Sequence, residues 1–293
     1  WKDLVGVFAH SQPEGPSAAV SLPENRYMQE TAVAPLVSDG ADPEIELSAG
    51  KAEYLDVLAH IHRILRPRKY LEIGVRRGAS LALARCPTVA VDPEPAIDRE
   101  VNCPLELHVM TSDRFFEEQA AAALRPDRPD LVFIDGMHLF EFALRDFMHA
   151  ERHASATTLI VVDDVYPNHP VQAERRRQSQ VWAGDLWKLH HCLHRYRPDL
   201  LLMPVDATPT GFLLVAGLNP NDQLLWDSYN PIVAEYKNMP IEPHGESALT
   251  RRGALSPDDP SLVALIRQLS IQRSVADDDS AELRQRLRRV LDR

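Results

Sequence analysis

The stretch YLEIGVRRGAS at residues 70–80 decides the fold. It consists of a short hydrophobic strand that runs into two glycines, Gly74 and Gly78, and then into a helix. Glycine lets the backbone turn sharply and approach a ligand closely, which a residue with a Cβ cannot do as easily. The next apolar strand, TVAV, ends at Asp92, where a carboxylate can accept both hydroxyls of a ribose. The spacing predicts a Rossmann-like nucleotide site.

The residues between the two glycines favour S-adenosylmethionine over a dinucleotide as the ligand. The dinucleotide fingerprint needs a further glycine where the backbone meets a pyrophosphate. Val75, Arg76 and Arg77 stand in that region instead. A cofactor without phosphates does not need so close an approach. The alternative is a glycine turn in another kind of α/β protein.

Glu72, Gly74 and Gly78 together resemble the first motif, Glu-x-Gly-x-x-x-Gly, of class I S-adenosylmethionine-dependent methyltransferases. The resemblance covers roughly residues 48–217. It implies an α/β fold with a Rossmann-like, seven-stranded, mostly parallel sheet, one antiparallel strand, and helices on both faces. It also implies that these three residues bind S-adenosylmethionine, with Glu72 and Gly74 at its methionine end.

Hydrophobic periodicity predicts strands and helices in alternation. Strands are expected at residues 70–75, 89–92, 105–110, 131–135 and 158–163, and helices at 48–65, 79–85, 113–124, 140–153 and 179–196. Two further strands, at residues 200–205 and 211–216, lie close enough to pair as a hairpin. This order indicates a mostly parallel sheet with one antiparallel strand near an edge.

The chain divides into three parts. Residues 1–45 are interrupted by prolines, which predicts an extended or flexible arm. Residues 46–218 hold the predicted methyltransferase domain. Residues 219–293 form an extension that is first Pro-rich and polar, with amphipathic helices predicted at 261–269 and 280–291. The last helix suits packing on its own domain or dimerisation, so a homo-oligomer is one alternative.

Composition limits the kinds of partner that suit this chain. A formal net charge of −11 argues against nucleic acid and anionic membrane surfaces. The sequence has no apolar run of about eighteen residues, the length that spans a membrane. Three scattered cysteines without a CxxC pair predict a reduced, cytoplasmic protein. Small neutral or cationic acceptors are therefore easier to accommodate.

Acidic residues end two neighbouring strands of the predicted sheet. Asp135 follows LVFI, while Asp163 and Asp164 follow LIVV. Neighbouring strand ends lie about 5 Å apart, at the edge where open parallel sheets bind ligands. Three carboxylates there repel one another unless a cation neutralises them, and oxygen ligands indicate Mg²⁺, Ca²⁺ or Mn²⁺. The sequence predicts a metal site at these residues; the alternative is that they cap a helix, a turn or a loop.

His138 stands three residues after Asp135, in the motif IDGMH. A short loop after the strand would direct its imidazole into the same cleft. Because histidine titrates near neutral pH, it suits removal of a proton from a substrate hydroxyl. The alternatives are a supporting structural role and direct metal binding.

This region resembles metal-dependent small-molecule O-methyltransferases, through Asp-Gly-x-His at residues 135–138 and Asp-Asp at 163–164. It is especially similar to those that methylate sugar hydroxyls in antibiotic biosynthesis. The resemblance implies that Mg²⁺ binds at the two acidic sites and that His138 is the base. Catechol-type relatives have Asp-Asn at the second site and use a lysine base, which is not present at position 138. This departure puts a phenol acceptor in doubt.

We therefore expect methyl transfer to a hydroxyl of a small molecule or sugar, with His138 and Asp135 as catalytic residues. Asp92 would bind the ribose, and Ser112 or Asp113 would border the adenine because they follow the third strand. Asp135 would also stand against the cofactor. Two alternatives stay open. One is a metal-independent methyltransferase for nitrogen or carboxylate acceptors, and the other is a noncatalytic interaction module that keeps the fold.

The segment between the fifth strand and the hairpin overhangs the strand ends and could form an acceptor pocket or a lid. It carries Arg175, Arg176 and Arg177, followed by Trp182 and Trp187. Tryptophan suits stacking on a sugar or an aromatic ring, and arginine suits an acidic acceptor. The alternative is a solvated charge run beside core tryptophans.

Overall fold

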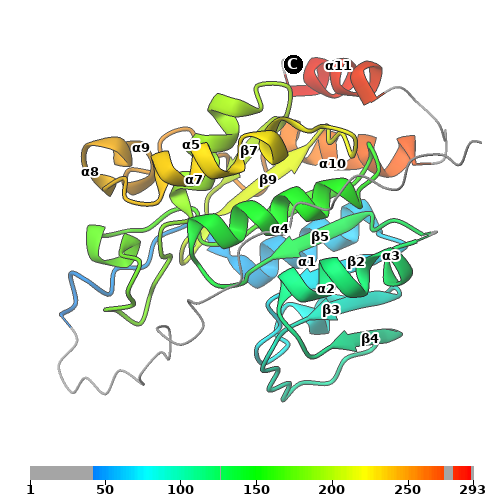
Figure 1. Ribbon diagram of the computed structural model, residues 1–293, viewed down its shortest axis with the longest axis horizontal. Helices are drawn as coiled ribbons and strands as arrows, with labels where there is room; N and C mark the ends of the chain where they lie inside the picture. Colours follow the sequence, from blue (N-terminus) through cyan, green and yellow to red (C-terminus); the bar gives the residue numbers. More distant parts are fainter. Residues whose placement is uncertain (1–41, 126, 274–279, 292–293) are drawn as a thin grey trace, which may run out of the picture. The chain divides into compact units, whose positions relative to one another are not determined.

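A seven-stranded sheet is the centre of the fold, as the sequence predicts. The computed structural model describes residues 42–125, 127–273 and 280–291 (Figure 1), so most of the predicted arm, residues 1–41, lies outside the described residues. The strand order is β4-β3-β2-β5-β6-β9-β7. Only β9 runs antiparallel to its neighbours, which confirms the predicted hairpin of the last two strands. The strands of this sheet are β2 (Tyr70–Ile73), β3 (Thr88–Val91), β4 (Leu105–His108), β5 (Leu131–Ile134), β6 (Leu159–Val162), β7 (Leu201–Val205) and β9 (Phe212–Ala216).

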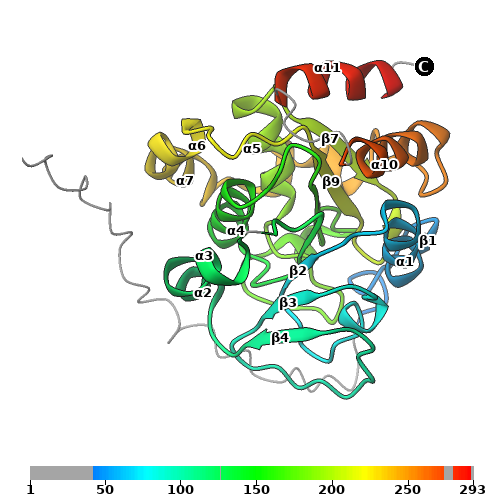
Figure 2. The same ribbon diagram turned by 90° about the vertical axis from the view of Figure 1, so that its right-hand side faces the viewer.

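The central strands are continuous apolar runs because both of their faces are covered. Every residue of β2, β3, β5 and β6 is buried. Parallel strands with helices on both faces have this pattern, whereas a half-exposed strand would alternate. The edge strand β4 differs, since three of its four residues are exposed (Figure 2). A separate two-stranded sheet pairs β1 (Ala52–Glu53) with β8 (Ala207–Thr208).

Helices cover both faces of the sheet, as predicted (Figures 1 and 2). One core cluster joins the sheet to α2, α4, α5 and α7, and the other joins it to α1, α10 and α11. The α-helices are α1 (Tyr54–Leu65), α2 (Ser112–Glu118), α3 (Ala120–Ala123), α4 (Phe140–Arg152), α5 (Trp187–Tyr196), α6 (Leu224–Asp227), α7 (Tyr229–Tyr236), α8 (Ile241–His244), α9 (Glu246–Leu249), α10 (Pro260–Gln272) and α11 (Ser280–Leu291). None of the helices in the described ranges is long and apolar enough to cross a bilayer.

Helix α10 shows how local sequence specifies one of these layers. Asp259 caps the helix by accepting a hydrogen bond from the Ser261 amide, and Pro260 occupies the first turn, where its missing N–H is not needed. Its buried residues recur at helical spacing on one face, at Leu262, Leu265, Ile266 and Leu269. The predicted C-terminal extension therefore contributes directly to the core of the sheet.

Two helices predicted from periodicity are much shorter in the structure. In place of a helix at 79–85 there is a 3-10 turn, η2 (Leu81–Leu83), because the chain must return within a few residues to enter β3. In place of a helix at 179–196, only α5 is α-helical, and the preceding residues are irregular. Gly184 has φ of +57° there, which is outside the right-handed helical region.

Smaller differences affect helix ends and the region after the hairpin. The predicted helix 113–124 is divided into α2 and α3 at Gln119, and α1 starts at Tyr54 because the preceding residues pair with β8. The Pro-rich stretch after residue 219 contains four short helices, α6 to α9. Elsewhere, between β6 and α5, the chain forms a 3-10 turn, η3 (Pro170–Ala173).

Candidate active site

The carboxyl ends of β2, β5 and β6 meet at one edge of the sheet. Because β5 pairs in parallel register with both neighbours, the residues that follow these strands come side by side. Asp135 donates its amide hydrogen to Ile73 O at 2.8 Å, and Asp163 donates its own to Ile134 O at 3.0 Å. The sequence-predicted residues Gly74, Asp135 and Asp163 therefore do converge.

Asp135, His138 and Asp164 form the cluster at this edge. One ligand atom from each of these three side chains lies within 4.8 Å of the other two. His138 Nε2 is 3.5 Å from Asp135 Oδ1, and His138 Nδ1 is 2.9 Å from Asp164 Oδ2. Each of the three side chains offers one atom that can coordinate a cation. We call this group the acidic cluster.

Asp163, which the sequence also placed among the metal ligands, is not a member of the acidic cluster. Its Oδ1 accepts the amide hydrogen of Asp164 at 2.8 Å. Asp164 has a left-handed backbone with φ of 65°, and its Oδ1 accepts a hydrogen bond from Thr210 Oγ1 at 2.5 Å. The geometry thus favours His138, rather than Asp163, as the third member of a metal site with Asp135 and Asp164.

The carboxylates of Asp135, Asp163 and Asp164 repel one another at this edge of the sheet. Burial raises the pKa of Asp135; the hydrogen bond from His138 opposes that shift, and the charge of Asp164 adds to it. Burial also raises the pKa of Asp163 well above its usual range, and Asp164 and Asp135 reinforce the effect. Burial alone would lower the pKa of His138, but Asp164 and Asp135 outweigh it and raise that pKa well above the usual value. The site therefore favours positive charge, which His138 supplies as an imidazolium.

The neighbours of His138 define which ring nitrogen can act as a base. Nδ1 faces Trp182 O at 3.1 Å in addition to the Asp164 carboxylate. Both of these oxygens only accept hydrogen bonds, so we assign a hydrogen to Nδ1. The lone pair of a neutral imidazole then lies on Nε2, on the side of Asp135. The ring also stacks on Trp182, with centroids 5.0 Å apart and planes 5° from parallel.

The two motif glycines have left-handed backbones, with φ of +86° at Gly74 and +76° at Gly78. A Cβ on Gly74 would lie 1.8 Å from Asp135 O, so that glycine allows two strand ends of the protein itself to touch. A Cβ on Gly78 would lie 3.1 Å from the Ile97 side chain. The sequence predicted a close approach of a ligand at these glycines. At Gly74, the close neighbour is the loop that carries the acidic cluster.

Glu72 is fully buried just before the glycine turn. Its Oε1 accepts a hydrogen bond from Ser80 Oγ at 2.6 Å, while its Oε2 is buried without a well-formed hydrogen bond among the described residues, although the buried Tyr70 hydroxyl interacts with this carboxylate. Burial raises the pKa of Glu72 to about 8. A buried acceptor without a well-formed hydrogen bond is unusual, and a bound cationic or N–H group would satisfy it.

Asp92 stabilises the glycine turn from within. Its Oδ2 accepts the amide hydrogens of Val75 and Arg76, both at 2.8 Å, and its Oδ1 accepts that of Glu94 at 2.7 Å. A carboxylate oxygen has two lone pairs, so one position remains, on Oδ1. The sequence predicted that Asp92 accepts both ribose hydroxyls; these contacts leave room for one of them, and ribose binding by Asp92 stays a prediction.

Ser112 and Asp113 open α2, as expected for residues that follow a strand end. The Asp113 carboxylate forms a two-pronged pair with Arg145, at 2.8 and 2.6 Å. Ser112 lies beside Asp146. Burial raises the pKa of Asp146 to about 7. Arg145 and Asp146, both on α4, were not identified from the sequence, because nothing local relates them to α2.

The overhanging segment is more tightly packed than the sequence suggested. Trp187 is only 3% exposed and cannot stack on an acceptor. Arg175 pairs with Glu141 and Asp185, each at 2.7 Å, and is committed to the protein. The alternative of a core tryptophan therefore holds for Trp187, whereas Arg175 is paired within the protein and does not belong to a solvated charge run.

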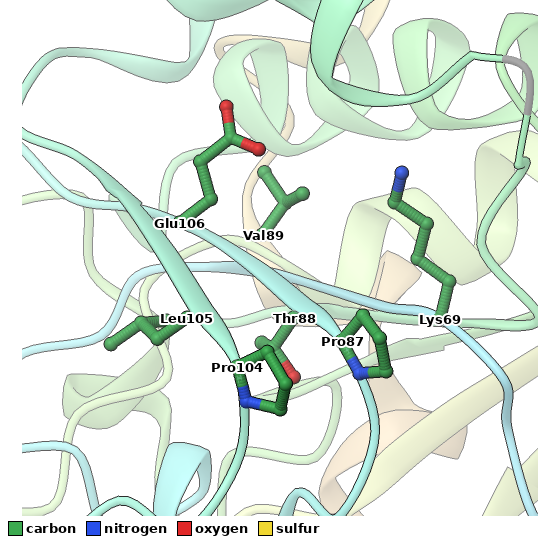
Figure 3. A pocket seen from close by; sticks show the side chains of 7 residues that line it. All are labelled: Lys69, Pro87, Thr88, Val89, Pro104, Leu105 and Glu106. Carbon is green, nitrogen blue, oxygen red and sulfur yellow. The ribbon is translucent and has the colours of Figure 1, made fainter.

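A separate pocket lies near the starts of β2, β3 and β4, and Figure 3 shows the side chains that line it. Its lining residues include Lys69, Pro87 and Pro104, which precede β2, β3 and β4. It is therefore at the amino ends of the strands, away from the acidic cluster.

Residues 71–165 match a family model described as "Methyltransferase domain". These residues run from β2 to just beyond β6 and contain both the glycine turn and the acidic cluster. No match was found among curated proteins.

Several solved methyltransferase structures are similar to part of the chain. The O-methyltransferase TomG from Streptomyces achromogenes, involved in tomaymycin synthesis and solved with SAM, is 20% identical, with a TM-score of 0.42 over 55% of this chain and 78% of its own. An O-methyltransferase from Bacillus cereus, in complex with SAH, is 15% identical, with a TM-score of 0.43 over 61% and 92%. The SAH-bound methyltransferase PaMTH1 from Podospora anserina is 15% identical, with a TM-score of 0.39 over 55% and 76%.

At these identities and TM-scores, no substrate or metal carries over to this chain. The match of residues 71–165 covers the strands and turns that form the site, and it shows a methyltransferase domain in this part of the chain.

Proposed function

We propose that the chain transfers a methyl group from S-adenosylmethionine to a hydroxyl oxygen of a small molecule or sugar, assisted by a divalent cation at the acidic cluster. The observation that carries this proposal is the convergence of Asp135, His138 and Asp164 beside the glycine turn. Within the acceptor class, the chain's net charge of −11 favours neutral or cationic molecules over anionic ones.

The cluster fits a divalent cation in both charge and ligand chemistry. Two carboxylates and one imidazole nitrogen, within 4.8 Å of one another, suit Mg²⁺ or Mn²⁺ when water completes the shell. The raised pKa values of Asp135 and His138 support a site that attracts positive charge. A divalent cation would neutralise the same carboxylates that the second imidazole proton neutralises in its absence.

The glycine turn fits S-adenosylmethionine. The buried Oε2 of Glu72 would accept the ammonium group of the methionine part, and the free position on Asp92 Oδ1 would accept one ribose hydroxyl. Ser112 stays the residue proposed at the adenine, together with the Asp113–Arg145 pair. When bound, S-adenosylmethionine supplies an electrophilic methyl group on a sulfonium.

The residues at this edge could together promote one in-line displacement. A bound cation would lower the pKa of the acceptor hydroxyl and fix its oxygen. His138 would accept the hydroxyl proton on Nε2, while its Nδ1–H stays directed at Trp182 O and Asp164. In such a displacement, the bond from oxygen to the methyl carbon would form as the carbon–sulfur bond of the sulfonium breaks, with S-adenosylhomocysteine as the leaving group. His138 would then release the acceptor's proton to solvent.

Direct coordination by His138 is a second role that the geometry favours, because its nitrogen lies within reach of both carboxylates. The two roles differ in what His138→Gln would do. If His138 is the base, Mn²⁺ affinity stays near that of the wild type and turnover falls about 100-fold or more, with partial recovery at higher pH. If it is a ligand, Mn²⁺ affinity falls as well.

Methyl transfer from labelled S-adenosylmethionine to a panel of hydroxylated acceptors, before and after EDTA treatment, tests the proposal. We expect Mg²⁺ to restore the chelated enzyme. We expect Asp135→Asn and Asp164→Asn to abolish this restoration while the Kd for S-adenosylmethionine changes only about twofold. Asp163→Asn should retain it, because Asp163 lies outside the acidic cluster.

Two outcomes would contradict the proposal. Activity that EDTA leaves unchanged would remove the cation and favour a metal-independent methyltransferase. Failure to bind S-adenosylmethionine at all would favour a noncatalytic module.

A further inference from the structure

His138 has a backbone conformation that it would not keep by itself. Its φ is 54°, in the left-handed region that is unfavourable for a residue with a side chain. Such a conformation persists only where the surrounding structure holds it in place. The side chain it directs into the acidic cluster is 24% exposed, so solvent and substrate can reach part of it.

Three of the four residues at 182–185 of the overhanging segment contact His138. The Trp182 ring stacks on the imidazole at 5.0 Å, and its carbonyl oxygen lies 3.1 Å from Nδ1. The Asp185 amide donates to His138 O at 3.2 Å. Gly184 has no Cβ, and one added there would lie 1.8 Å from His138 O. The segment therefore contacts both the ring and the backbone of His138.

Asp185 holds the other side of the same loop. Its Oδ1 accepts the amide hydrogen of Phe140 at 2.7 Å, two residues beyond His138. Its Oδ2 pairs with Arg175 at 2.7 Å and with Lys188 at 2.8 Å. The side chain is 1% exposed, so the two cations are direct partners of a buried side chain and fix its position. The backbone and side chain of Asp185 thus hold the residues on both sides of Leu139.

The segment is itself supported from behind. Gln172 O accepts the amide hydrogens of Ala183 and Gly184, both at 3.0 Å. The Gln172 side chain, which is fully buried, donates through Nε2 to the carbonyl oxygens of Ile45 and Leu47, each at 2.8 Å. A fixed support of this kind is what a strained loop requires.

We propose that residues 182–185 position His138 for its role in the acidic cluster, and that Asp185 is the main positioning residue. This inference rests on the proposed function of the acidic cluster. Trp182 O sets the hydrogen of the imidazole on Nδ1, and Asp185 and Gly184 set the backbone that aims Nε2 at Asp135. Polar groups that orient a histidine in this way typically change metal affinity or activity 10- to 100-fold when removed.

Ordinary core stabilisation is the competing explanation for Asp185, and Asp130 provides a matched control. Asp130 is also a buried carboxylate that accepts a backbone amide hydrogen, from Arg68, and pairs with two cations, Arg68 and Arg273. It precedes β5 at the opposite edge of the sheet from the acidic cluster. Asp130→Ala should therefore lower stability as Asp185→Ala does, without reaching His138.

The test uses the full chain labelled with ¹³C at histidine Cε1. The His138 signal is assigned by its loss in His138→Gln, and the ring current of Trp182 should displace it from the signals of exposed histidines. We expect Asp185→Ala and Gly184→Ala to move it toward the exposed histidines and to lower turnover at least tenfold; if His138 is a metal ligand, the Kd for Mn²⁺ rises at least tenfold as well. Asp185→Asn keeps an oxygen for the Phe140 amide and should retain the wild-type signal, as should Asp130→Ala.

A wild-type His138 signal in folded Asp185→Ala and Gly184→Ala would overturn the positioning role, and so would an equal displacement in Asp130→Ala. Gly184→Ala changes no charge and stays decisive if loss of the ion pairs unfolds Asp185→Ala. If the wild-type protein binds no Mn²⁺, the metal part of the proposed function fails. The histidine signal still decides the positioning role in that case.

Discussion

Two residues of the acidic cluster, His138 and Asp164, have left-handed backbones. In each case a contact from a distant part of the chain accompanies the conformation: Asp185 for His138, and Thr210 for Asp164. The sequence showed that Asp135 would lie at the strand end, because a strand followed by a carboxylate is a local pattern. It could not show that Asp164, rather than Asp163, faces His138, since that depends on a hydroxyl 46 residues away.

Glu72 provides a prediction that separates stability from ligand binding. Its folded pKa, about 8, lies above the usual 4.5, so the unfolded chain ionises it at lower pH than the folded chain does. The stability that this group contributes is complete below pH 4.5 and is lost as pH rises toward 8. We expect the free energy of unfolding to fall by roughly 3–5 kcal/mol across this window from Glu72 alone.

Glu72→Gln removes the titration while keeping the size of the side chain. Urea unfolding between pH 5 and pH 8 should therefore show a smaller loss of stability in the variant than in the wild type. The same variant should bind S-adenosylmethionine about tenfold more weakly, because an amide replaces the carboxylate opposite the ammonium group. If the free energy of unfolding falls equally in the two proteins between pH 5 and pH 8, the assignment of this pH dependence to Glu72 is contradicted.

At the scale of elements, the strands could be predicted more fully than the helices. β2, β3, β5 and β6 were located because buried parallel strands are short apolar runs, a signal that does not depend on distant contacts. Helix-favouring residues at 79–85 gave a false helix, since the tertiary path from Gly78 to β3 allows only a 3-10 turn. The irregular backbone before α5 was not predicted, because its contacts with His138 are distant in sequence and leave no local pattern.

Helix α10 provides a prediction at this scale. Leu265 is fully buried in the cluster beneath the sheet, whereas Ile271 on the same helix is 61% exposed. Leu265→Ala should lower the free energy of unfolding by about 2–5 kcal/mol, through lost burial and the cavity that remains. Ile271→Ala should change it by less than about 0.5 kcal/mol. Equilibrium urea denaturation measures both, and equal effects would mean that α10 does not pack as described.

For the molecule as a whole, the site depends on segments that are far apart in the sequence. The glycine turn and the acidic strand ends come from residues 71–165, which match the methyltransferase family. The contacts that fix His138 come from beyond that match, at residues 182–185, and these are supported in turn by residues 45–47. Fold class and cofactor class could therefore be predicted from one motif, while the arrangement of the site required the three-dimensional structure.

The central claim is that the carboxylates of Asp135 and Asp164 hold a single divalent ion beside the cofactor, with the His138 imidazole next to it. The most direct measurement is an anomalous difference map from a crystal of the full chain grown with Mn²⁺ and S-adenosylhomocysteine. The account predicts one strong peak in bonding contact with both carboxylates, next to the imidazole, and no peak in Asp164→Asn. A map without a peak at these residues, from an enzyme that still transfers methyl groups in EDTA, would contradict it.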